Sequence, residues 1–138
     1  MQHVKALGKY LSGFPQWKEG LPAVDTTPAI PEGCGLFPRG VEVLKRQEDV
    51  TGGVQLRLRQ SFLLRRTALR TETSAGWLLA LQNWALENPP RELETVFGTN
   101  LQLRLEKGRL IRAEQSGTAT YEVAVIIEYT KEKHQYEN

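Results

Sequence analysis

Apolar residues near the start of the chain recur at the spacing of a helix. Val4, Leu7 and Leu11 fall on one face of a helix over residues 4–11, with lysines between them. Gly13 follows, and glycine commonly ends helices. The pattern therefore predicts a short amphipathic helix at the N-terminus.

The clearest helical pattern covers residues 73–88. Thr71 or Thr73 can cap its N-terminus, and Asn88 before two prolines stops it. Its apolar residues form a single stripe that includes two tryptophans, which we interpret as core residues: Trp77, Leu78, Leu81, Trp84 and Ala85. This stripe predicts that the helix is the main cover of a sheet.

Two segments in the middle of the chain alternate apolar and polar residues as strands do. Residues 41–47 alternate in part, and residues 54–67 form the longest strand pattern. The turn between them, at residues 49–53, contains a Gly-Gly pair, so the two segments predict a β-hairpin. Three residues interrupt the alternation of the longer strand: Gln60, Leu63 and Arg66.

Alternation returns in the last third of the chain. Residues 101–106 and 109–114 predict two strands joined by a tight turn at Lys107-Gly108, and residues 119–129 predict a third strand. Consecutive strands joined by short turns pair antiparallel, which indicates the α+β class. We expect a single antiparallel or mixed sheet of about five strands, with the main helix packed on one face and a short N-terminal helix.

Prolines and glycines gather in residues 14–40, where five of the seven prolines fall. Proline lacks a backbone donor and fixes φ, so we expect an irregular segment with at most short edge strands. Residues 131–138 are polar, and we expect a frayed tail there. The length of 138 residues predicts a single domain over residues 1–138.

Composition limits the function classes. Hydrophobic residues make up 40% and charged residues 25%, which is ordinary for a folded soluble domain and argues against disorder. The single Cys34 excludes a disulfide within one chain. No apolar run approaches the ~20 residues that cross a bilayer, and the N-terminus lacks the apolar stretch of a signal peptide, so no membrane partner is expected. A net charge of +2 is too small to mark a dedicated nucleic-acid binder.

Candidate catalytic groups are few. His3 and His134 lie near the chain ends, where positioning is poor, and we interpret them as loose surface residues. Cys34 has no predictable partner base, and the spacing of the glutamates selects no acid–base pair. We therefore predict a protein that is not an enzyme, with no catalytic residue, metal or cofactor. A small-molecule enzyme would need a pocket with a perturbed carboxylate.

A cluster of arginines on the longest predicted strand is the main candidate for a binding surface. Arg57, Arg59 and Arg65 share one strand face, where they could contact phosphates or an acidic partner, pair with cross-strand glutamates, or face a neighbouring subunit. The glutamates available for such pairing include Glu42, Glu122 and Glu128. Trp17, in the proline-rich segment, could anchor that segment or contact a partner.

Four parts of the chain follow a recognisable layout. They are Ala6-Leu7-Gly8-Lys9-Tyr10-Leu11 leading to Trp17-Lys18-Glu19-Gly20, then Gln60-Ser61-Phe62, then Trp77-Leu78-Leu79-Ala80-Leu81-Gln82-Asn83, and last Gly117-Thr118-Ala119-Thr120-Tyr121-Glu122-Val123 through Ile127-Glu128-Tyr129. In this layout the chain resembles the small phage structural proteins called minor capsid or minor tail proteins, which are related to tail terminators. The closing strand is the most specific part, because a small-residue turn precedes an aromatic residue and alternation then continues to its end.

The resemblance implies a structural role in the virion, as a tail terminator or at the head–tail connection. Tail terminators form a ring, commonly a hexamer, so the implied partners are copies of the chain itself, tail-tube proteins and head connector proteins. The implied location is the virion and, during assembly, the host cytoplasm. Candidate subunit or partner contacts are Trp17, Arg57, Arg59 and Arg65. The alternative is a small nucleic-acid-binding module that uses the arginine face; under the first hypothesis no nucleic-acid partner is expected.

Overall fold

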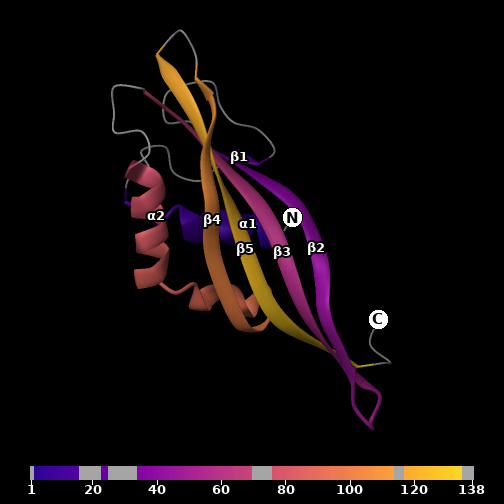
Figure 1. Cartoon of the computed structure of the whole chain (residues 1–138). Helices are drawn as coiled ribbons and strands as arrows, with labels where there is room; N and C mark the ends of the chain where they lie inside the picture. Colours follow the sequence, from indigo (N-terminus) through magenta and orange to yellow (C-terminus); the bar gives the residue numbers. More distant parts are fainter. Residues whose placement is uncertain (1, 16–22, 25–33, 70–75, 114–116, 135–138) are drawn as a thin grey trace.

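Four long antiparallel strands form the sheet of this protein, and its helices lie on one face of that sheet (Figure 1). The computed structural model describes residues 2–15, 23–24, 34–69, 76–113 and 117–134. In chain order its elements are α1 (Gln2–Leu11), β1 (Ala23–Val24), β2 (Cys34–Glu48), β3 (Gly53–Leu69), α2 (Gly76–Glu87), the 3-10 helix η1 (Arg91–Thr95), β4 (Thr99–Ala113) and β5 (Thr118–His134). The predicted α+β class is confirmed, with one long strand fewer than expected.

The centre of the sheet is the pair β3 and β5, in the order β1-β2-β3-β5-β4. These two strands pair over their whole length, from Gly53 opposite His134 to Leu69 opposite Thr118, without a shift in register. β1 adds only two residues, which pair in parallel with β2. Within the described residues, β4 and the part of β2 beyond β1 are therefore open edges.

The unbroken register of β3 and β5 decides which side chains face the helices. Even-numbered residues of β3 and odd-numbered residues of β5 share that face, and Phe62, Leu64, Val123 and Val125 are fully buried on it. The alternation also passes without interruption through the three residues that interrupt the sequence pattern: Gln60, Leu63 and Arg66.

Gln60 is a polar residue on the helix-facing side of β3. Its Oε1 lies 2.9 Å from the His3 Nδ1 and accepts a hydrogen bond of 3.3 Å from the Tyr129 hydroxyl. A polar group with partners avoids the cost of burial without a hydrogen bond. The amide can therefore stay in a position where the pattern calls for an apolar residue.

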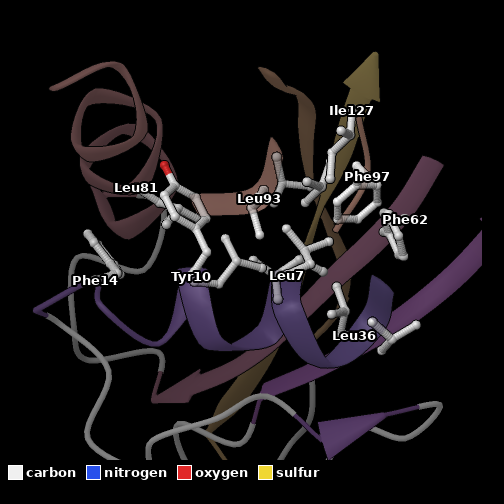
Figure 2. Packing of buried hydrophobic residues seen from close by; sticks show 14 of the residues in the cluster. Leu7, Tyr10, Phe14, Leu36, Phe62, Leu81, Leu93, Phe97 and Ile127 are labelled. Carbon is white, nitrogen blue, oxygen red and sulfur yellow. The ribbon is translucent and has the colours of Figure 1, made fainter. Parts of the chain in front are cut away.

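α1 crosses the sheet over the middle of the core. Leu7 and Leu11 are fully buried, and Figure 2 shows Leu7 pointing from α1 into the hydrophobic cluster between Phe62 and Leu93. The sequence predicts the longer helix as the main cover of the sheet, and the structure shows that α1 covers it as well. The short helix α1 can cover the sheet because the residues of its narrow apolar stripe are buried against the core.

α2 packs beside α1 and over β4. The Gln82 Nε2 donates to the backbone oxygen of Leu105 at 3.1 Å. The rings of Tyr10 and Trp84 lie 5.0 Å apart, and the Tyr10 hydroxyl donates to the backbone oxygen of Asn88 at 2.7 Å. Burial raises the pKa of Tyr10 to about 12, so this hydroxyl keeps its proton and remains a donor.

The predicted turn at Lys107-Gly108 is wrong. β4 continues through these residues, which form a β-bulge where two residues of β4 face one residue of β5. Lys107 takes a left-handed φ of 59°. Gly108 makes room for α2, since the Leu78 Cδ1 lies 3.1 Å from the position that a β-carbon would occupy. Turns and bulges both use left-handed residues, and only the pairing with β5 decides between them.

Two other boundaries also differ from the prediction. β2 begins at Cys34, inside the segment 14–40 that was expected to be irregular, and passes Pro38 next to a bulge on an open edge, where proline is tolerated. β5 continues to His134, inside the expected tail 131–138, because the β2–β3 hairpin extends far enough to pair with it. Residues 135–138 lie outside the described ranges.

The centre of α1 offers a direct test of the core. The substitution Leu7→Ala removes a fully buried side chain and leaves a cavity, so we expect the free energy of unfolding to fall by about 2–5 kcal/mol. Urea denaturation followed by tryptophan fluorescence measures it. The control Lys5→Ala, at an exposed position of the same helix, should change it by less than ~0.5 kcal/mol. Equal effects of the two substitutions would contradict the packing of α1.

Candidate functional site

The face of the sheet opposite the helices is the candidate site. No helix among the described residues covers it. Odd-numbered residues of β3 and even-numbered residues of β5 point to this face, and they include the three arginines singled out in the sequence. We call this surface the open face. It is formed by the four long strands.

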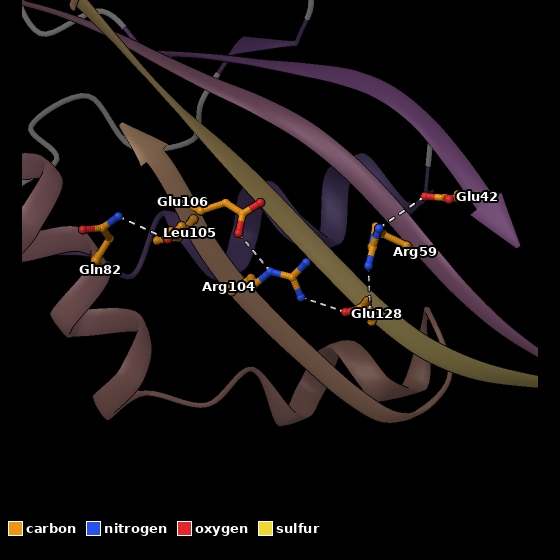
Figure 3. Close-up of polar contacts among 7 residues, drawn as sticks. All are labelled: Glu42, Arg59, Gln82, Arg104, Leu105, Glu106 and Glu128. Atoms are coloured by element: carbon orange, nitrogen blue, oxygen red, sulfur yellow. Dashed lines mark hydrogen bonds and ion pairs between the residues drawn. The ribbon is translucent and has the colours of Figure 1, made fainter. Parts of the chain in front are cut away.

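A chain of ion pairs crosses all four strands of the open face (Figure 3). Arg59 lies between Glu42 at 3.4 Å and Glu128 at 3.5 Å. Arg104 continues the chain on the other side of Glu128, at 2.8 Å, and reaches Glu106 at 3.1 Å. The hydrogen bond from Arg104 is the largest influence on Glu128 and holds the pKa of this carboxyl below its usual value.

A second ion-pair cluster centres on Glu122, whose side chain is only 5% exposed. Arg65 Nε donates to one carboxylate oxygen at 2.8 Å, and Arg109 donates to the other at 3.1 Å. Burial opposes ionisation of Glu122, but the two arginines outweigh it and the pKa of Glu122 lies below its usual value. The Arg65 guanidinium also lies 4.8 Å from the centre of the Phe37 ring.

Arg57, the third candidate arginine, has no carboxylate partner among the residues that the structure describes. It donates to the backbone oxygen of Asn100 at 2.8 Å and to the Thr130 hydroxyl at 3.1 Å. The structure thus places all three arginines on one face, as predicted, and two of them pair with cross-strand glutamates, as one of the three interpretations expects. The candidate Trp17 lies outside the described residues.

A hollow crosses the four long strands of the open face. The hollow has a volume of about 570 Å³ and is lined by Arg39, Gly40, Val41, Glu42, Arg59, Ser61, Phe62, Leu63, Lys107, Arg109, Glu122 and Ala124. Arg39 and Lys107 are exposed and form no ion pair with any residue in the described ranges, while Glu42 and Glu122 are already paired. The hollow therefore keeps a net positive charge.

Sequence reasoning missed Arg39 and Lys107. Neither belongs to the arginine cluster of the longest strand, and each comes from a different strand at a bulge. Their proximity depends on strand order and on how the bulges displace the backbone. The signal that could have drawn attention to Lys107 is the Lys-Gly pair itself.

The candidate nucleophile and histidines are distributed over the fold. His3 is not a loose surface residue, since its ring is half-buried and lies 4.2 Å from that of Phe97. Cys34 begins β2, and His134 ends β5 at the opposite end of the sheet. In the part of the chain that the structure describes, no group of three or more His, Cys, Asp or Glu side chains is placed to hold a metal ion.

Exposed apolar side chains lie along both open edges. On β2 they are Val41 and Val43, which are 61% and 58% exposed. On β4 they are Leu110 and Ile111, at 52% and 41%. The sequence shows these residues as apolar positions of predicted strands, but only the strand order reveals that they lie on edges.

Comparison of the sequence with protein-family models and with curated proteins finds no match. Among the described helices, none has the length and apolar character needed to cross a membrane.

The Glu122 cluster predicts a specific pH dependence of stability. The pKa of Glu122 is lower in the folded state than in the unfolded chain, so its ionised form stabilises the fold. This stabilisation is fully present above the ordinary glutamate pKa of about 4.3. It is lost as the pH falls from about 4.3 through the lower pKa of the folded state. Glu122→Gln should lower the free energy of unfolding at neutral pH by about 1–3 kcal/mol.

Denaturant unfolding at a series of pH values measures the difference between the two proteins. We expect the difference to shrink as the solution is acidified, because protonation removes the same charge in the native protein. The control Glu94→Gln changes an exposed carboxylate that has no ion-pair partner within the described ranges, and it should have little effect at any pH. A difference that stays constant with pH would contradict the cluster's role.

Proposed function

We propose that this protein is a structural component of a phage tail, with a tail-terminator or head–tail connection role, and that it acts by assembling with copies of itself. The observation that carries the proposal is the pair of long, open strand edges with exposed valine, leucine and isoleucine side chains. Open edges are ready sites for association, and proteins that remain monomeric protect them. The resemblance of the sequence to tail terminators supports the same role.

The direction of the strands suits a repeating contact. β2 and β4 lie at opposite sides of the sheet and run in opposite directions, because three successive antiparallel pairings separate them. The β4 edge of one copy can therefore meet the β2 edge of the next in the antiparallel sense, with the helices of both copies on one side. A contact of this kind closes into a ring when the rotation per subunit divides a full turn.

The partners proposed with this function are other copies of the chain in a ring, which could be a hexamer, together with tail-tube and head connector proteins. The proposed location is the virion, reached through assembly in the host cytoplasm. Subunit contact by Arg57, Arg59, Arg65 and Trp17 stays a prediction. The three arginines already have partners inside the sheet, so any such contact would add to these interactions or exchange them.

Assembly through the edges is tested with a charge on β4. Ile111→Lys places a lysine on an open edge, where such a charge opposes strand pairing. We expect light scattering to show a mass that rises with concentration for the native chain, and a mass close to the 15.6 kDa monomer for the variant.

Leu79→Lys is the matched control, because it adds the same charge at an exposed position of α2 that is not on a strand edge. It should assemble like the native chain. A native chain that stays monomeric at every concentration would count against the proposed function.

The nucleic-acid alternative predicts a different result in a gel-shift assay. Arg59, Arg65, Arg104 and Arg109 are neutralised by glutamates, so we expect only weak binding to duplex DNA at low salt and none at moderate salt. A dedicated binder would show tight binding with a steep dependence on salt concentration. Such a result would favour the alternative over the tail-structural role.

A further inference from the structure

We infer that the hollow on the open face of one copy receives the acidic corner of the next copy, where the acidic corner is formed by Glu87, Glu92 and Glu94. The inference rests on the proposed self-assembly and adds a second contact to it, because the edge-to-edge contact leaves the corner and the hollow on opposite faces of the sheet. The contact is head to tail, with two different surfaces of the same chain.

The acidic corner lies on the β4 side of the molecule. α2 ends at Glu87, and η1 begins after three intervening residues and packs against β4. The carboxylates of Glu87, Glu92 and Glu94 are exposed, and none of them forms an ion pair within the described part of the chain. One guanidinium, that of Arg91, lies among them, so the corner keeps a net negative charge.

The hollow crosses the open face, because β2, β3, β5 and β4 all contribute residues to its lining. Arg39 borders it from β2, and Lys107 borders it from β4. The cations Arg39 and Lys107 have no ion-pair partner among the described residues, so they can take up carboxylates without breaking an existing interaction. A volume of about 570 Å³ holds several side chains.

The floor of the hollow favours a protein segment as the occupant. Leu63 and Ala124 provide apolar contact, whereas the carboxylates of Glu42 and Glu122 on its walls would repel a run of phosphates. A short helix that projects separate carboxylates can reach the two rim cations and avoid these walls. The acidic corner has this form, since η1 carries Glu92 and Glu94 on a single short turn.

The position of the two surfaces makes the contact repeatable. The acidic corner lies with the helices on one face of the sheet (Figure 1), whereas the hollow lies on the opposite face. Each copy can therefore use its corner on one neighbour and its hollow on the other.

The test uses two double variants of the full chain and their mixture. Arg39→Glu with Lys107→Glu reverses the hollow, and Glu92→Lys with Glu94→Lys reverses the corner. Each alone should raise the concentration needed for assembly by at least about tenfold, because like charges then meet across the contact. Sedimentation velocity over a concentration series measures this concentration.

Mixing the two variants separates a head-to-tail contact from general charge effects. In an equimolar mixture the native corner of the hollow variant can enter the native hollow of the corner variant, and the reversed corner can enter the reversed hollow. The mixture should therefore assemble at concentrations where neither variant assembles alone. A chain with all four substitutions has both charges exchanged and should regain assembly.

The control Lys5→Glu with Lys9→Glu makes the same change of charge as the hollow variant, at exposed positions of α1, and should assemble like the native chain. Thermal unfolding of every variant confirms that it is folded. If the native chain assembles and both reversed variants assemble equally well, the inference fails while the proposed function stands. If the native chain never assembles, the proposed function itself fails.

Discussion

The pairing of β3 with β5 is the constraint on which the rest of the structure depends. Its register runs without a shift from Gly53 to Leu69, and therefore every side chain of both strands has a determined face. One face becomes the floor of the hydrophobic core under α1 and α2. The other brings arginines of β3 opposite glutamates of β5, because Arg59 faces Glu128 and Arg65 faces Glu122. A shift of one residue would exchange these two faces and destroy both.

The sequence is informative where structure depends on neighbouring residues. The period of the apolar residues predicts both helices, the hairpin at residues 49–53 and the alternation of β5. The sequence pattern gives the wrong local structure where pairing with a strand distant in the sequence determines it. These places are the bulge at Lys107, the strand that passes Pro38, and the end of β5. A local pattern cannot show that a partner strand is present to satisfy the backbone of these residues.

The candidate site divides in the same way. Three arginines on one face could be predicted from the alternation of β3 alone, and their pairing with glutamates was one of the open interpretations. The hollow could not be predicted, since Arg39 and Lys107 line it together only through the strand order and the bulges of β2 and β4. The open edges could not be predicted either, because the sequence pattern of an edge strand does not differ from that of a central strand.

Gly108 links the bulge to the placement of α2. The Leu78 Cδ1 would lie only 3.1 Å from a β-carbon at this position, so the lack of a side chain lets the helix pack closely against β4. The far end of that helix carries Glu87. A methyl group at position 108 would require the Leu78 side chain to move by a few tenths of an ångström, so the seating of this helix depends on a residue of β4 that carries no charge.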